Sequence, residues 1–141
     1  MKKYWTYLKY VLEHKKNVFF VCVKKGMFIH ALTHDLSKLL PIEFVSYAKY
    51  FYGSEEDKKN SGFDYGWLHH QRANKHHWDY WVDGNGEAVD MPVKYIKQML
   101  CDWEAMAIKF KDTPLKYYTK NKGSMIFSEK TRLALEKYLS E

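Results

Sequence analysis

The stretch Ala31-Leu32-Thr33-His34-Asp35-Leu36-Ser37-Lys38-Leu39 places an imidazole, a carboxylate and an ammonium group within five residues of an otherwise apolar run. We expect a helix here, from about Phe28 to Leu40, because His30, His34 and Lys38 recur at every fourth position and share one face. Side chains on the inner face of such a helix pack into a core, where histidine and aspartate are costly unless they are paired or bound to a cation. The stretch therefore predicts a helical fold with a buried polar site.

Apolar residues spaced by three and four predict helices along most of the chain. The expected helical segments are 3–14, 15–25, 28–40, 42–51, 65–81, 91–110 and 128–139, of which the first two could be one helix. Residues 53–64 are expected to form a solvated loop, and the turn Asp83-Gly84-Asn85-Gly86 suits a short hairpin near residues 81–89. A chain of 141 residues has the size of one domain. The expected fold is thus all-α, a compact helical bundle that comprises residues 1–141.

The composition is typical of a soluble globular protein with a high share of aromatic residues. Hydrophobic residues make up 46% of the chain and aromatic residues 18%, so bulky rings should fill the core or offer a stacking surface for a base. Cys22 and Cys101 lie far apart in apolar contexts, which predicts buried free thiols and no disulfide. No apolar run is long enough to span a membrane. Together these features favour a cytoplasmic protein.

The net charge of +6 favours anionic partners. The basic residues are dispersed in pairs such as Lys2-Lys3, Lys15-Lys16 and Lys58-Lys59, and dispersed pairs are typical of solvated helix faces. An anionic, phosphate-containing small molecule such as a nucleotide is therefore the expected partner. Nucleic acid is the less favoured alternative, no membrane partner is expected, and the pattern leaves the oligomeric state open.

The His34-Asp35 doublet has a structural and a functional interpretation. It can be a hydrogen-bonded pair within a core. It can also share one cation, and its mixed nitrogen and oxygen donors suit Mn²⁺, Fe²⁺, Co²⁺, Ni²⁺ or Zn²⁺. Such a cation polarises a phosphoryl oxygen and lowers the pKa of water. Lys38 follows closely enough to neutralise phosphoryl charge in the transition state.

The segment His34-Asp35-Leu36-Ser37-Lys38 resembles the His-Asp-x-x-Lys signature of the HD-domain metal-dependent phosphohydrolase superfamily. His14, twenty residues before His34, is similar to the first ligand of that family, and the segment around Asp102 resembles its final aspartate helix. The resemblance covers residues 8–110 and is closest to small HD-like proteins of bacteria and phages. It implies a metal held by His14, His34, Asp35 and Asp102, with Asp35 and Lys38 as catalytic residues.

Four further histidines lie between the doublet and Asp102, namely His69, His70, His76 and His77. In binuclear members of the superfamily, histidines in this interval hold a second metal, so these four are candidates for a second metal or for phosphate binding. On a helix, His70, Asn74 and His77 share one face while His69 and His76 share the neighbouring face, and the pattern does not choose between them. His30 and Asn74 are expected to support the ligands rather than to bind the metal.

The expected function is a metal-dependent phosphohydrolase that acts on a nucleotide or a related phosphate ester through one or two divalent ions and an activated water. The segment after His77 lacks the Gly-Tyr-Pro motif of cyclic-di-GMP phosphodiesterases, and the Glu-Asp pair of guanosine tetraphosphate hydrolases is missing. Monoester and diester substrates therefore both stay open. The alternative is a non-catalytic helical module that binds a nucleotide or nucleic acid, and inability to bind a transition metal would favour it.

Overall fold

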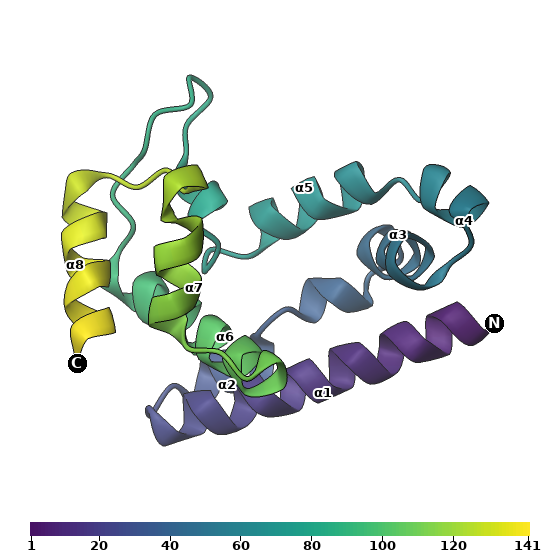
Figure 1. Ribbon diagram of the computed structural model, residues 1–141, viewed down its shortest axis with the longest axis horizontal. Helices are drawn as coiled ribbons and strands as arrows, with labels where there is room; N and C mark the ends of the chain where they lie inside the picture. The colour runs from purple at the N-terminus through teal and green to yellow at the C-terminus, as the bar shows by residue number, and fades with distance from the viewer.

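One long helix, α1 (Lys2–Lys24), forms the base of the structure, and the other elements follow above and beside it (Figure 1). The computed structural model describes residues 1–141 and contains no β-strand, which confirms the expected all-α fold. None of its helices combines the length and the apolar character needed to cross a membrane. With η denoting a 3₁₀ helix, the order after α1 is α2 (Phe28–Thr33), η1 (Leu36–Leu39), α3 (Pro41–Tyr52), α4 (Glu55–Lys59), α5 (Phe63–Ala73), η2 (Trp78–Trp81), α6 (Val93–Phe110), α7 (Pro114–Asn121), η3 (Lys122–Ser124) and α8 (Glu129–Ser140).

Helix α1 buries a single stripe of its surface. Its buried residues Tyr7, Val11, His14 and Val18 are three or four positions apart, so they line one face of the helix. That face contacts α2, α3 and α6. His14 belongs to the buried stripe, and the packing of α1 therefore carries this imidazole into the interior.

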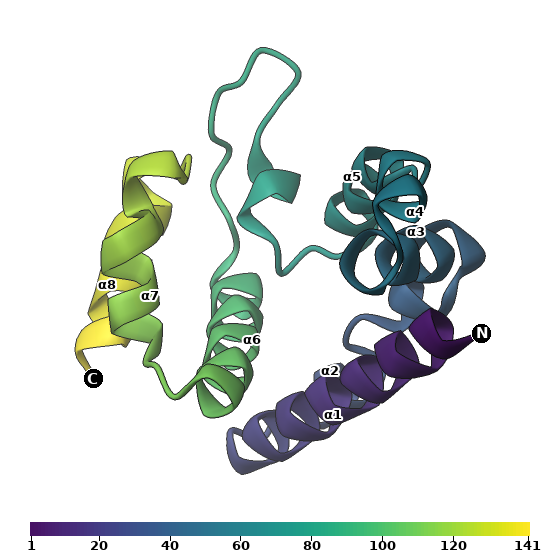
Figure 2. The same ribbon diagram turned by 45° about the vertical axis from the view of Figure 1, so that its right-hand side comes forward.

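Three clusters of buried apolar side chains join the helices. The first joins α1, α2 and α6 and consists of Val18, Val21, Cys22, Ala31, Cys101 and Ala105. The second joins α6, α7 and α8 and consists of Met91, Ile96, Met99, Tyr118 and Leu135. The third joins α1 and α3 and consists of Tyr7, Val11, Tyr47 and Ala48. Figure 2 shows the consequence: α6 stands between α7 and α8 on one side and α3, α4 and α5 on the other.

Several expected boundaries are wrong. The helix expected over 28–40 is interrupted, because α2 ends at Thr33 and η1 begins at Leu36. The helix expected over 65–81 is shorter, because α5 ends at Ala73 and an irregular segment, residues 74–77, connects it to η2. The segment 53–64 contains the short helix α4, which a capping box at its first turn stabilises. Helix α7 has no counterpart among the expected segments.

The turn at residues 83–86 closes one antiparallel bridge, between Val82 and Ala88, and no longer ladder. Asp83 Oδ1 accepts hydrogen bonds from the backbone N–H groups of Asn85 and Glu87, each at 2.9 Å, and so stabilises the turn. On the other side of the bridge the pairing ends with the hydrogen bond from Val89 N–H to the carbonyl of Trp81 (2.8 Å), because residues 78–81 form η2. The expected hairpin is therefore reduced to a single bridge.

Helix α5 packs closely against α3 because residue 66 has no side chain. A Cβ atom at Gly66 would collide with Ser46 Oγ and would lie 3.0 Å from the carbonyl oxygen of Ile42. Ser46 Oγ donates to the carbonyls of Ile42 (2.6 Å) and Glu43 (3.1 Å), so it is not free to move away. His70 lies one turn after Gly66, and the close approach therefore brings His70 toward α3.

Replacing Gly66 with Ala should destabilise the protein although alanine is the better helix former. The added methyl group must push α5 away from α3, and overpacking of this kind typically costs about 1–3 kcal/mol. Urea denaturation would measure the loss. Gly84→Ala is the matched control, because a Cβ at this turn glycine would meet no atom within 4 Å. A Gly66→Ala protein as stable as the parent would contradict the prediction.

Candidate metal centre

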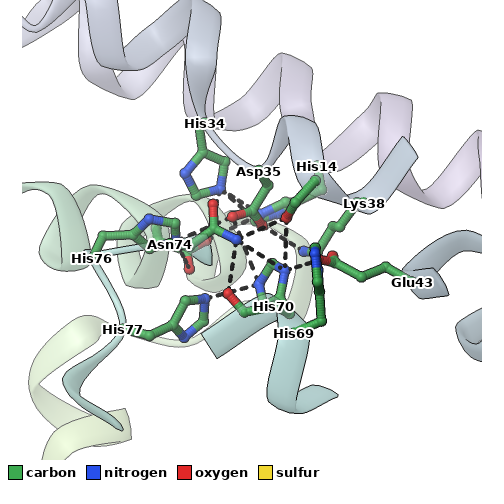
Figure 3. A network of polar contacts seen from close by, with 12 residues as sticks. His14, His34, Asp35, Lys38, Glu43, His69, His70, Asn74, His76 and His77 are labelled. Atoms are coloured by element: carbon green, nitrogen blue, oxygen red, sulfur yellow. Dashed lines mark hydrogen bonds and ion pairs between the residues drawn. The ribbon is translucent and has the colours of Figure 1, made fainter. Parts of the chain in front are cut away.

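His34 and Asp35 lie at the break between α2 and η1. The backbone N–H of His34 still donates to the carbonyl of His30 (2.8 Å), but Asp35 adopts the left-handed conformation with φ of 53°. Aspartate tolerates this conformation better than most residues do. Adjacent side chains on a regular helix do not face each other. Because the backbone turns here, the two side chains point toward the same place, as Figure 3 shows.

Lys15 holds this turn from α1. Its Nζ donates to the carbonyl oxygens of Leu32 (2.8 Å) and His34 (3.2 Å), which lie at the C-terminal end of α2. A cation is favourable at this end of a helix, where carbonyl groups lack intrahelical partners. The unusual backbone of Asp35 is therefore fixed by a contact from another helix, as strained residues at functional sites commonly are.

Four side chains form the first cluster: His14 from α1, His34 and Asp35 from the turn, and Asp102 from α6. His14 Nε2 lies 3.0 Å from Asp102 Oδ1 and 3.2 Å from His34 Nε2. His34 Nε2 lies 3.3 Å from Asp35 Oδ2 and 3.5 Å from Asp102 Oδ1. Atoms that bind one metal at about 2.1 Å lie about 3.0–3.4 Å apart at octahedral or tetrahedral corners. His14, His34 and Asp35 each bring one such atom within 4.8 Å of the others, and Asp102 lies at ligand spacing from His14 and His34.

The other oxygen of Asp35 faces a second cluster, which consists of His70, His76 and His77. His76 Nε2 lies 3.2 Å and His70 Nε2 3.7 Å from Asp35 Oδ1. His77 Nε2 lies 2.9 Å from His70 Nε2, and His76 Nε2 lies 3.7 Å from Asp102 Oδ2. Asp35 therefore stands between the two clusters with one oxygen toward each. A carboxylate in this position can bridge two ions.

Glu43 orients His70 from outside the second cluster. Its carboxylate is fully buried at the first turn of α3, with Oε2 2.8 Å from His70 Nδ1 and Oε1 2.6 Å from His69 Nδ1. A histidine whose Nδ1–H donates to a carboxylate presents an unprotonated Nε2 on its other side, which is the usual arrangement of metal-binding histidines. Asn74 completes the support, because its Nδ2 donates to Ser37 Oγ (2.8 Å) and to the carbonyl of His70 (2.9 Å).

Four buried atoms at the junction of the two clusters lack a hydrogen bond of acceptable geometry: Asp35 Oδ1, Asp35 Oδ2, Asp102 Oδ1 and His76 Nε2. Each has a polar neighbour within ion-pair distance, and Lys38 Nζ lies 2.7 Å from Asp35 Oδ2. Buried polar atoms without hydrogen bonds are rare and often mark the site of a bound ion or water. The chemistry of this set, two carboxylates and an imidazole, suits a cation.

The pKa values of His34 and Asp35 also indicate that a positive charge is favoured beside the carboxylates of Asp35 and Asp102. Burial lowers the pKa of His34, but Asp35 and Asp102 outweigh burial and raise that pKa to about 9. Burial would raise the pKa of Asp35, but His34 and Lys38 outweigh it and hold that pKa well below its usual value. In contrast, burial and the neighbouring imidazoles His34 and His76 lower the pKa of His30 to about 3, so this ring is neutral.

A cavity of about 730 Å³ opens onto both clusters. Its floor includes His14, Lys38, His70, His76, His77 and Asp102, whereas His34 and Asp35 lie beneath the floor and do not line it. The side chains of His34 and Asp35 are at most 5% exposed. The site thus combines a buried anchor with a face that a small molecule can reach.

The structure brings together most of the residues that the sequence singled out. His14, His34, Asp35 and Asp102 form the first cluster, and Lys38 pairs with Asp35. His30 Nε2 lies 3.3 Å from His34 Nδ1, and Asn74 Nδ2 donates to the carbonyl of His70. His30 also brings a ring nitrogen within 4.8 Å of ligand atoms of His34 and His76, so its supporting role stays a prediction.

The four downstream histidines do not separate into the two helical faces that the sequence suggested. The chain turns at residues 74–77, and this turn places His77 beside both His70 and His76. His69 stays apart, is about one-third exposed and contacts Glu43 instead. Glu43 itself was missed. Its only sequence signal is an acid in the first turn of a helix, which the helix dipole alone would explain.

A comparison with known protein families matches residues 3–141 to the family of unknown function DUF5662, and the chain therefore belongs to this family. Comparisons with curated proteins and with solved structures give no match. The interpretation of the site consequently rests on its own geometry.

Replacing Asp35 with Asn should lower the pKa of His34 from about 9, because one of the two carboxylates that stabilise the imidazolium is removed. The raised pKa lies above the ordinary value of 6.5. The metal-free parent therefore gains stability from His34 that is fully present below pH 6.5 and is lost as pH rises through about 9. The variant should lose much of this dependence.

Titration of the His34 ring by NMR, together with urea denaturation across the same pH range, would check this prediction. Asp79→Asn is the matched control, because Asp79 lines the cavity without contributing to the pKa of His34. An unchanged His34 pKa in the Asp35→Asn protein would show that the carboxylate does not set it.

Proposed function

We propose that this protein is a metal-dependent phosphohydrolase of the HD type that acts on a nucleotide or a related phosphate ester. The observation that carries the proposal is the convergence of His14, His34, Asp35 and Asp102 from three separate parts of the fold. His34 and Asp102 each lie 3.0–3.5 Å from other members of this set, through the pairs His14–Asp102, His14–His34, His34–Asp35 and His34–Asp102. The sequence order and spacing of these four residues resemble the HD signature. The cavity above them gives a phosphate ester access to the site.

The first cluster would hold one divalent ion, and the second cluster offers ligands for another. His14, His34, Asp35 Oδ2 and Asp102 form the first set, and Asp35 Oδ1 with His70, His76 and His77 forms the second. Two subsets, His14 with His34 and Asp35 and Asp35 with His70 and His77, each bring their ligand atoms within 4.8 Å of one another. Mixed imidazole and carboxylate donors suit Mn²⁺, Fe²⁺, Co²⁺, Ni²⁺ or Zn²⁺. Ions held there would polarise a phosphoryl oxygen and lower the pKa of a water molecule.

The protein's own residues supply the remaining steps. Lys38 lines the cavity while its Nζ stays 2.7 Å from Asp35, so it can neutralise charge on a phosphoryl oxygen that approaches the floor. Asp35 would orient the attacking water as a ligand shared by the two sets; its lowered pKa makes it a weak base, so it is not assigned the proton transfer. A histidine of the second cluster that reaches the cavity, such as His77, can stabilise the leaving or non-bridging oxygens.

The metal requirement can be tested with a matched pair of variants on α6. Asp102→Asn removes a ligand of the first cluster, whereas Glu104→Gln removes an acid two residues later that pairs with Lys25 on the surface. Loss of a ligand's hydrogen-bond partner alone costs about 10–100-fold in metal affinity, so the loss of the ligand should cost at least as much. Asp102→Asn should therefore lose metal and hydrolysis together, and Glu104→Gln should retain both.

The measurements are metal content of the purified protein and hydrolysis of phosphate monoesters and diesters with Mn²⁺, Co²⁺ or Ni²⁺. Activity that survives the double change His34→Ala and Asp35→Ala would refute the catalytic assignment. A protein that binds no transition metal but binds a nucleotide would instead identify the non-catalytic binding module.

Glu43 offers a separate test of the second site. Glu43→Gln keeps the size of the side chain but removes the charge shared by His69 and His70. We expect the second ion to bind about 10–100-fold more weakly while the first ion is unaffected. Calorimetric titration with Mn²⁺ would resolve the two affinities. Equal weakening at both sites, or at neither, would contradict the role assigned to Glu43.

A further inference from the structure

The walls of the cavity differ chemically from its floor. Eleven of the 27 lining residues are Phe, Tyr or Trp, and they belong to α1, α3, α5, η2, α6 and α7. Several of these rings are unusually exposed for their size, including Phe51 (58%), Phe110 (62%), Tyr117 (41%), Tyr52 (39%) and Trp67 (38%). Large aromatic side chains that remain exposed around a cavity are typical of sites that bind a small organic molecule.

Two tryptophans begin the aromatic walls directly beside the clusters. Trp67 on α5 stacks on His70, with ring centroids 5.8 Å apart and planes at 24°, and its ring lies edge-on to His77 at 5.7 Å. Trp103 on α6 follows Asp102 in the chain and packs against Tyr117 at 5.0 Å. A ring connected to a phosphate on the floor would therefore reach an aromatic surface within a short distance.

Positive charge, in contrast, is confined to the floor. Lys38 is the one lysine among the lining residues, and no arginine lines the cavity. The walls carry the carboxylates Asp79 and Asp112 instead. A second or third phosphate on the same molecule would find no further lysine or arginine among the lining residues to balance its charge. Recognition of several phosphates normally requires several lysines or arginines.

We infer that the cavity selects phosphate esters that carry a single phosphate and a planar aromatic ring, and that it disfavours polyphosphates. The inference rests on the proposed function for the place of the phosphate, and it adds the class of the organic group. Gln71, Thr113, Asn121 and Ser124 line the cavity as well, so the polar edge of a ring can find hydrogen-bond partners there. Nucleoside monophosphates and simple aryl phosphates share this chemistry.

Binding of phosphonates, which are not hydrolysed, tests the inference independently of turnover. Calorimetry on the full chain, with and without Mn²⁺, would compare phenylphosphonate with methylphosphonate. We expect the aromatic compound to bind at least about tenfold more tightly, because a planar ring stacks favourably on aromatic side chains whereas a methyl group cannot. Equal affinities for the two compounds would overturn the inference. Tighter binding of ATP than of AMP would overturn it as well.

Substitutions of single tryptophans then show which side chains cause the preference for phenylphosphonate over methylphosphonate. Trp67→Leu and Trp103→Leu should each remove most of the advantage of phenylphosphonate, whereas Trp67→Phe, which retains a ring, should preserve it. Trp5→Leu is the control, because Trp5 is 60% exposed on α1 and does not line the cavity. An advantage that persists in both leucine variants, with circular dichroism unchanged from the parent, would overturn the inference.

The two proposals fail in different ways. Preference for phenylphosphonate without hydrolysis of any ester would refute the phosphohydrolase and support the aromatic cavity. Hydrolysis of glycerol phosphate and 1-naphthyl phosphate at equal kcat/KM would support the phosphohydrolase and refute the aromatic cavity.

Discussion

The buried carboxylate of Asp35 is the constraint on which the site depends. A charge taken out of water is costly unless charged and hydrogen-bonding groups surround it. Here the compensating groups come from different parts of the chain: His34 beside it, Lys38 one turn later, and His76 from the segment after α5. The helices must therefore meet around this one side chain, and the left-handed turn at Asp35 makes both of its oxygens available.

The rigidity of the ligands follows from where they sit on the helices. His14 and Asp102 project from the two longest helices, and the apolar cluster containing Cys22 and Cys101 packs those helices together close by. Ligands on packed helices are held more precisely than ligands on loops. The second cluster is different in kind. His76 and His77 lie in an irregular segment, and its geometry depends on Glu43, Asn74 and the close contact at Gly66.

The sequence predicted the helical fold because helix periodicity is a local signal, whereas the residues of the first cluster were singled out by their resemblance to the HD signature. The break at residues 34–35 was not predictable in the same way. The apolar repeat continues through it, and the turn depends on Lys15, which lies some twenty positions earlier. Glu43 was not predicted as a site residue for a related reason. An acid at a helix start has a sufficient local explanation, and only the packing of α5 on α3 shows that this carboxylate is buried against two histidines.

The positions of the lysines in the structure limit what the positive net charge can contribute to binding in the cavity. Three of them form ion pairs with acids of neighbouring elements: Lys25 pairs with Glu104, Lys109 pairs with Glu13 and lies over the Tyr10 ring, and Lys3 pairs with Asp57. They contribute to a long-range field that attracts anions, but they do not line the cavity. The lysines that attract anions therefore lie apart from the residues that line the cavity. The net charge of +6 favours the approach of anions in general, whereas the cavity presents one lysine and eleven aromatic side chains to a molecule that enters it.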